Sequence, residues 1–140
     1  MTTHGPAPRP CDSCPYRLDV PSGVWSREDY EKLPLYDQPT FSQPPAVFLC
    51  HQVNGRVCAG WAGCHDMDES LALRMAGIAG TMSAGDIEAT LDYVSPVPLH
   101  PSGMAAAEHG LADMDAPSDD AHRMQAKLVR RRPEIAGGAP

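Results

Sequence analysis

Aromatic residues, long apolar runs and an export signal are all scarce or missing in this sequence. Only 6% of its 140 residues are aromatic, which leaves little material for a large aromatic core. No apolar stretch approaches the roughly 18 residues that a membrane-spanning helix requires. The first ten residues lack the apolar segment of a signal peptide, so we expect a cytoplasmic protein. Disulfides are uncommon in that compartment, where grouped cysteines indicate metal or redox chemistry.

Proline and cysteine are concentrated in the first half of the chain. Nine of the fifteen prolines precede Phe48, and all five cysteines lie between Cys11 and Cys64. Because proline fixes φ and lacks a backbone donor, we expect loops in this region. The length fits a single domain. We therefore expect a disordered arm at 1–10, one metal-binding domain at 11–133 and a disordered tail at 134–140. Within the domain we expect a cysteine region at 11–66 and a helical part at 67–133.

Two short elements are predicted in the first half. Ser26 and Asp29 form a Ser-x-x-Asp capping pattern, followed by Tyr30 and Leu33 on one helical face, and Pro34 is expected to end this helix.

The turn dipeptide Asn54-Gly55 predicts a small hairpin between residues 48–52 and 56–59. Such a hairpin brings Cys50 and Cys58 together.

The second half is predicted to contain three to four short helices. Leu71, Met75 and Ile78 recur at helical spacing, which predicts an amphipathic helix over 68–79. Ser83 caps a second helix, in which Ile87, Leu91 and Val94 form the apolar face. Ser102 caps a third helix over 103–109, with Gly110 as its stop.

A last helix is predicted to begin at residues 117–120 and to carry Met124 and Leu128. Five of the eleven basic residues lie in Arg123–Arg132, near its end, where positive charge complements the helix dipole. Residues 1–122 hold 6 basic and 17 acidic side chains, so this acidic body repels phosphates and anionic membranes. The fold class is therefore small and mainly α, with an irregular, metal-stapled first half.

The cysteines are the residues of this sequence that point most directly to a function. Cys11 and Cys14 form a Cys-x2-Cys pair, whose spacing lets both sulfurs grip one ion. Two further ligands are needed, and Cys50 and Cys58 can supply them across the predicted turn. The reserve candidates are Cys64, His51 and His65.

The spacing of the cysteines is compatible with two kinds of metal centre. Zinc fingers and ribbons usually have two pairs of ligands that are closely spaced in the sequence, whereas only one such pair is present here. The wider spacing of the other cysteines, together with Cys14-Pro15, favours a 4Fe–4S cluster used for electron transfer or redox sensing. The alternative is a structural zinc site in an adaptor or regulator that binds a protein or nucleic acid.

The motifs Cys-x2-Cys-Pro-Tyr-Arg, Cys50-His51 and Cys-Ala-Gly-Trp resemble a family of small uncharacterised proteins from actinobacteria and their phages. The resemblance extends from about Cys11 to the helix near Arg123. It implies that Cys11, Cys14, Cys50 and Cys58 are the metal ligands. Cys64 lies outside the family motif, and the family has no established activity.

Other functions are less well supported. Cys14-Pro15-Tyr16 resembles the start of a glutaredoxin active site, but Arg17 stands where the second cysteine belongs, which weakens the case for a thiol oxidoreductase. Nothing in the sequence brings Cys64 and a histidine together for hydrolysis, and no catalytic residue is assigned. We expect an unidentified protein partner, with nucleic acid disfavoured by the acidic body.

Overall fold

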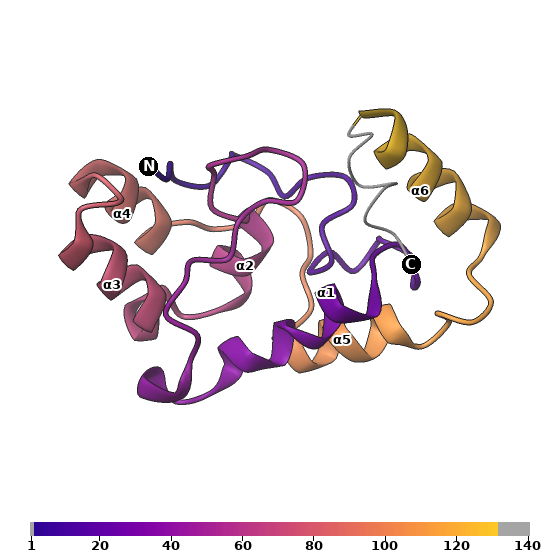
Figure 1. Cartoon of the computed structure of the whole chain (residues 1–140), viewed down its shortest axis with the longest axis horizontal. Coiled ribbons are helices and arrows are strands. Elements are labelled where there is room, and N and C mark those ends of the chain that lie inside the picture. The colour runs from indigo at the N-terminus through magenta and orange to yellow at the C-terminus, as the bar shows by residue number, and fades with distance from the viewer. Residues whose placement is uncertain (1, 132–140) are drawn as a thin grey trace.

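Helices provide the regular secondary structure of the computed structural model, which describes residues 2–131 (Figure 1). The α-helices are α1 (Arg27–Glu31), α2 (Ala59–Cys64), α3 (Leu71–Ala79), α4 (Ala84–Leu91), α5 (Gly103–Leu111) and α6 (Asp119–Arg131). Three 3-10 helices accompany them: η1 (Leu33–Asp37), η2 (Thr40–Ser42) and η3 (Met67–Glu69). The prediction of a small, mainly α protein is confirmed, and four α-helices follow the cysteine region.

Serine side chains start the helices at the predicted places. The hydroxyls of Ser26, Ser83 and Ser102 each accept a backbone N–H three residues later, at 3.0–3.2 Å. These bonds satisfy donors that the first turn of a helix leaves open. The predicted start of the helix at residue 68 was wrong. Residues 67–69 form η3 instead, and Ser70 caps α3 by accepting from the backbone N–H of Leu73.

The predicted apolar face of α3 was also wrong. Met75 and Ile78 are 42% and 81% exposed, whereas Ala72, Leu73 and Ala76 are buried. The buried face consists mostly of small side chains, which let the helix backbone approach the core closely. On α4, too, a residue of the predicted apolar face is exposed: Leu91 faces solvent, whereas Thr90 is buried.

Helix α5 packs against α1 and η1, and the three elements lie side by side (Figure 1). Its buried residues are all small: Gly103, Ala106, Ala107 and Gly110. Gly110 was predicted to stop this helix, but α5 continues to Leu111. The glycine faces the ring of Tyr30, where a Cβ would lie 2.6 Å from Cζ. Gly110 therefore serves the packing of α5 on α1.

Pro34 was predicted to end the first helix, but it lies inside the helix that follows. Helix α1 ends at Glu31, and Pro34 occupies the first turn of η1. A proline fits there because its fixed φ matches a helix start and its missing N–H would have no partner. Leu33 and Tyr30 are buried, 0% and 1% exposed.

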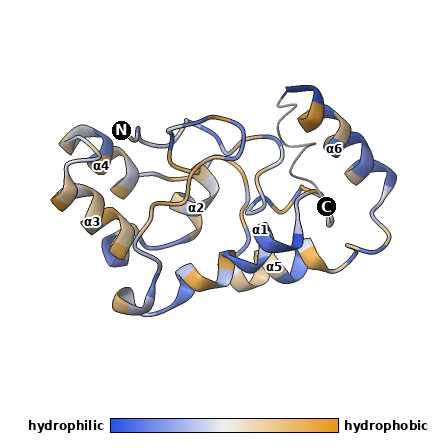
Figure 2. Cartoon of the chain, in the orientation of Figure 1, coloured by the Kyte–Doolittle hydropathy of each residue, from blue (hydrophilic) through white to orange (hydrophobic). Residues whose placement is uncertain are grey.

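The elements are arranged around α2. In Figure 1, the α3–α4 pair lies at one end of the molecule, α6 at the other, and α2 between them. Figure 2 shows that α6 is mostly hydrophilic and α3 mostly hydrophobic. Helix α6 packs through Ala121 and Leu128, which are 0% and 3% exposed. The end predicted for this helix, Arg132 and Pro133, and the predicted tail at 134–140 lie outside the described residues.

The segment predicted as a disordered arm has backbone hydrogen bonds from residue 3 onward. The N–H of Thr3 donates to the carbonyl of Thr81, and the N–H of His4 donates to that of Gly55. The carbonyl of His4 accepts the N–H of Val57. These bonds place the start of the chain along the segment that carries Cys58.

Candidate metal centre

Two loops carry the four cysteines of the predicted ligand set. In the first loop, the N–H of Cys14 donates to the carbonyl of Cys11 at 3.0 Å, which closes the Cys-x2-Cys turn. The second loop turns at Gly55, whose φ of 73° is readily adopted by glycine. Around it, the N–H of Cys50 donates to the carbonyl of Arg56, and the N–H of Cys58 donates to that of Phe48, both at 2.9 Å. The predicted hairpin is present in this narrow form, with a single antiparallel bridge between its two sides.

The structure brings the four sulfur atoms into a chain of interactions. The Sγ atoms of Cys14 and Cys58 lie 3.8 Å apart. The thiol of Cys11 is close enough to those of Cys14 and Cys50 to affect their pKa values. We call Cys11, Cys14, Cys50 and Cys58 the four-cysteine group. The electrostatic interactions run from Cys50 through Cys11 and Cys14 to Cys58, and the last pair is in direct contact.

Backbone N–H groups point at these sulfurs. The N–H of Trp61 donates to the Sγ of Cys58 at 3.4 Å, so this cysteine is also the N-cap of α2. The backbone N–H of Tyr16 also favours the thiolate of Cys14 and lowers its pKa, and the N–H groups of Gln52 and Val53 act on the pKa of Cys50 in the same direction. Such donors stabilise a thiolate in preference to a thiol.

The contacts among the thiols and their burial oppose ionisation. The hydrogen bond with Cys14, together with burial, raises the pKa of Cys11 to about 11 against the opposing effect of Cys50. At Cys14 the hydrogen bond with Cys11 lowers the pKa, but contact with Cys58 and burial outweigh it and hold the pKa well above its usual range. Contact with Cys11 and burial raise the pKa of Cys50. A cation bound by these sulfurs would have to displace their protons.

Close packing holds the two loops together. Cys14 and Cys58 are 1% and 3% exposed, while Cys11 and Cys50 are half-buried. The first turn of α2 approaches the Cys14 side chain at Gly60, where a Cβ would contact the Sγ of Cys14 and lie 2.8 Å from the Cβ of Tyr16. Position 60 therefore requires glycine, because a Cβ there would overlap the Sγ of Cys14.

Aromatic rings cover the group. Tyr16 is fully buried and packs edge-on against Phe48, with ring centroids 5.9 Å apart. The indole of Trp25 donates from Nε1 to the carbonyl of Ser13, inside the Cys-x2-Cys turn, at 2.7 Å. The aromatic residues near the cysteines in sequence are thus near them in space as well.

The positions of the sulfurs do not yet form a closed coordination sphere. Within residues 2–131, no three His, Cys, Asp or Glu side chains are placed so that they could hold one metal ion together. The four-cysteine group is an open chain of interactions, and the sulfur positions of the described residues do not close into a tetrahedron. The predicted ligand set therefore stays a prediction.

The reserve candidates lie in other surroundings. His51 stacks on Trp25 at 4.5 Å between ring centroids and forms an ion pair with Asp29 at 3.5 Å. Cys64 is half-buried, and burial together with the nearby Asp37 raises its pKa to about 12. His65 belongs to a different network, described next.

Sequence reasoning missed Asp37. One carboxylate oxygen accepts the N–H of Gly103 at 2.8 Å and faces Nε2 of His65 at 2.9 Å, and the other accepts the N–H of Met104 at 2.8 Å. Asp37 thereby fixes α5 to α2. No local pattern identifies this residue, because its partners lie 28 to 67 positions away in the sequence.

Two basic residues of α6 face the Cys-x2-Cys turn. Lys127 and Arg131 lie 3.2 Å and 3.7 Å from a carboxylate oxygen of Asp12, which stands between the two cysteines of the turn. The hydrogen bond from Lys127 is the main cause that lowers the pKa of Asp12, and the charges of Lys127 and Arg131 add to it. Part of the basic segment is therefore paired within the molecule.

The fold and the four-cysteine group define a small, mainly α-helical protein with thiols gathered between two loops. The chain belongs to a family of unknown function (DUF6283), whose model matches residues 6–132. Neither the curated proteins nor the solved structures contain a match to it. Among the helices of residues 2–131, none is long and apolar enough to cross a membrane.

Proposed function

We propose that the four-cysteine group binds a metal and that this metal joins the two halves of the protein. The observation that carries the proposal is the approach of Cys14 and Cys58 to 3.8 Å, with the backbone N–H of Trp61 donating to the sulfur of Cys58. Thiols held together in this way gain strongly from a cation, because each thiolate repels the next. The resemblance of the cysteine motif to the actinobacterial and phage proteins points to the same four ligands.

Zinc fits the separation of one pair of these sulfurs, Cys14 and Cys58. Zn–S bonds of about 2.3 Å place the sulfurs of a tetrahedral site about 3.8 Å apart. This is the separation of Cys14 and Cys58. Four cysteines leave no open coordination position, which is typical of a structural zinc site. Binding would draw Cys50 and Cys58 together and close the open chain of sulfurs.

A 4Fe–4S cluster is the second candidate, and the surroundings of the cysteines favour it. The buried rings of Tyr16 and Phe48 beside the group are the kind of shield that limits solvent exposure of a cluster and tunes its potential. A cluster is bulkier than one ion, however, and requires the sulfurs of Cys14 and Cys58 to move apart. Electron transfer or redox sensing would then be the function.

With zinc, the protein is a metal-stapled adaptor or regulator that acts in the cytoplasm by binding another protein. A thiol oxidoreductase is disfavoured because Cys14, the residue that resembles a redox nucleophile, is 1% exposed. Binding of nucleic acid is disfavoured because Lys127 and Arg131 are already paired with Asp12.

Metal analysis of the full chain tests the proposal. Protein purified without oxygen and analysed by mass spectrometry for zinc, iron and sulfide should contain one zinc ion per chain and be colourless. Brown protein that contains iron and sulfide would show that the metal centre is a 4Fe–4S cluster and not zinc. Protein that contains neither metal, and whose melting temperature does not rise when zinc is added, would refute the metal site.

A further inference from the structure

The helix pair α3–α4 presents an apolar face to solvent. Met75 and Ile78 on α3 are 42% and 81% exposed, and Leu91 on α4 is 41% exposed. Val94, which follows α4, is 83% exposed. Their helical spacing is typical of side chains that are buried against a partner. Each of the two helices therefore carries an apolar face that the described part of a single copy leaves in solvent.

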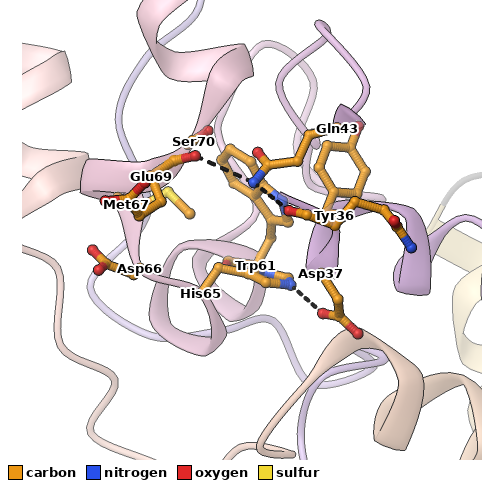
Figure 3. Close-up of a pocket in the computed structure, with 10 residues that line it drawn as sticks. Tyr36, Asp37, Gln43, Trp61, His65, Asp66, Met67, Glu69 and Ser70 are labelled. Atoms are coloured by element: carbon orange, nitrogen blue, oxygen red, sulfur yellow. Dashed lines mark hydrogen bonds and ion pairs between the residues drawn. The ribbon is translucent and has the colours of Figure 1, made fainter. Parts of the chain in front are cut away.

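Contacts on the opposite side of α3 hold this face outward. The buried side chains of the helix are Ala72, Leu73 and Ala76. The side-chain amide of Gln43 donates to the carbonyl of Glu69, just before α3 (Figure 3), and its oxygen accepts the N–H of Leu71. Turning Met75 and Ile78 inward would break these contacts. A surface that covers them therefore has to approach the helix pair from outside it.

The two helices run antiparallel, which sets the levels of their side chains. Residues 80–83 connect them, and α4 contacts both α3 and η3, the element directly before α3. The end of α4 therefore lies beside the start of α3. Arg74 comes six positions before Gly80 and Glu88 comes five positions after Ser83, so the two charged residues lie at nearly the same level of the pair. Figure 1 places this pair at the end of the molecule away from α6.

The apolar face is flanked by one unpaired charge of each sign. Arg74 and Glu88 are both exposed. Across residues 2–131, neither side chain forms an ion pair, and the Arg74 guanidinium donates to the backbone carbonyl of Asp68. Arg74 lies one turn from Ile78, and Glu88 lies one turn from Leu91. Each chain thus offers a cation on α3 and a carboxylate on α4 beside its exposed apolar side chains.

A second copy of the same face complements both features. In an isologous interface a surface meets itself across a two-fold axis. An axis that runs parallel to the helices places α3 of one copy over α4 of the other and keeps their levels. Arg74 of each copy then faces Glu88 of the other, twice in the dimer, and the exposed apolar side chains fill the space between them. The arrangement is a four-helix bundle in which neighbouring helices run antiparallel.

We propose that the α3–α4 face is the interface of a homodimer with this arrangement. Covering Met75, Ile78 and Leu91 supplies the attraction, because apolar surface leaves water. The two pairs of Arg74 with Glu88 select the partner and the register, because a reversed docking opposes like charges. A second copy supplies both charges at the required levels by symmetry alone. The interface includes no residue of the four-cysteine group.

Analytical ultracentrifugation of the full chain tests the proposal. Between low micromolar concentrations and about 1 mM, the parent should change from the mass of one chain to twice that mass. Ile78→Glu should weaken association at least tenfold. It should leave the circular dichroism of dilute protein unchanged, because this side chain is mostly exposed. Val129→Glu, at a 38% exposed position on α6, is the matched control and should associate as the parent does.

Reversed charges test the identity of the partner and the register. Arg74→Glu and Glu88→Arg each place like charges opposite one another in both pairs of a homodimer, so each variant should associate at least tenfold more weakly. In an equimolar mixture of the two variants, each pair between unlike copies joins opposite charges again. The mixture should therefore form a heterodimer with an affinity close to that of the parent.

Four results would overturn the interface. A parent chain that stays monomeric up to about 1 mM would exclude a second copy and leave the face to a different protein. A dimer that survives Ile78→Glu, or that is lost in Val129→Glu, would place the interface elsewhere. A mixture of the two charge variants that remains monomeric would exclude the pairing of Arg74 with Glu88. Because the readout is mass and not metal content, the outcome is separate from that of the four-cysteine proposal.

Discussion

The Sγ atoms of Cys14 and Cys58 lie 3.8 Å apart although 44 positions separate the two residues in the sequence. Cys14 ends the Cys-x2-Cys turn, and Cys58 caps α2 by accepting the N–H of Trp61. One sulfur contact therefore joins the N-terminal loop to the start of the central helix. A metal bound here would stabilise both elements at once.

Replacement of Cys58 by serine should separate metal binding from helix capping. Serine is a good N-cap, so Cys58→Ser keeps the cap of α2 while removing a thiolate. We expect loss of the bound zinc and a fall in the free energy of unfolding of several kcal/mol, up to about 10. Metal analysis and denaturant unfolding measure the two effects.

The matched control for this variant is Cys64→Ser. Cys64 is half-buried and lies outside the four-cysteine group. Its replacement should leave the zinc content unchanged and alter stability by no more than about 1 kcal/mol. Loss of zinc from Cys64→Ser, or its retention in Cys58→Ser, would show that the ligand set is wrong.

A single methyl group at Gly60 should disturb the same contact. In Gly60→Ala the new Cβ meets the Sγ of Cys14 and the Cβ of Tyr16, which are held by the core. Overpacking of this kind costs about 1–3 kcal/mol. We expect a lower melting temperature and weaker zinc binding, measured by calorimetry and by competition with a chelator.

Gly85→Ala provides the comparison. Gly85 lies exposed in the first turn of α4, where a Cβ would meet nothing closer than the Ser83 hydroxyl at 3.9 Å. Because alanine favours the helix, this variant should be more stable than the parent by up to about 1 kcal/mol. If both glycine variants behaved alike, the packing argument at Gly60 would fail.

The parts of this fold that depend on nearest neighbours were predictable from the sequence. Ser26, Ser83 and Ser102 start helices because each hydroxyl meets an N–H only three residues later. The turn at Gly55 was predictable for the same reason, and it places Cys50 and Cys58 on facing sides of one loop. These local features and the Cys-x2-Cys spacing account for each of the two cysteine pairs, whereas the approach of Cys14 to Cys58 depends on tertiary packing.

The buried faces of the helices were less predictable. Periodicity favoured Met75 and Ile78 on α3, yet the core accepts Ala72 and Ala76. The role of Gly110 depends on the ring of Tyr30, which comes from a distant part of the chain. Partners such as these are set by tertiary packing, which overrides local pattern in short helices.

Removal of the Asp37 carboxylate should loosen the attachment of α5. Asp37→Ala leaves the N–H groups of Gly103 and Met104 without their acceptor and removes the hydrogen-bond partner of His65 Nε2. We expect a loss of about 2 kcal/mol in the free energy of unfolding. Hydrogen exchange should be faster at the start of α5, whereas Asp115→Ala, at an exposed position, should match the parent. Equal protection in both variants would contradict this role.

Acid should destabilise the protein through His100. This side chain is 8% exposed, its Nε2 has no hydrogen-bond partner within the described chain, and its ring lies 5.1 Å from that of His109. Burial, and to a smaller degree His109, lower the pKa of His100 below its usual 6.5. The unfolded chain therefore binds the proton more readily than the folded one.

The contribution of His100 to stability is consequently complete above about pH 6.5 and is lost as the pH falls toward the lowered pKa of the folded state. In His100→Gln, the free energy of unfolding should depend less steeply on pH between about 6.5 and 5 than in the parent chain. His122→Gln, at an exposed position on α6, should keep the parent slope. Denaturant unfolding at a series of pH values measures all three slopes, and an unchanged slope in His100→Gln would assign the acid sensitivity to other groups.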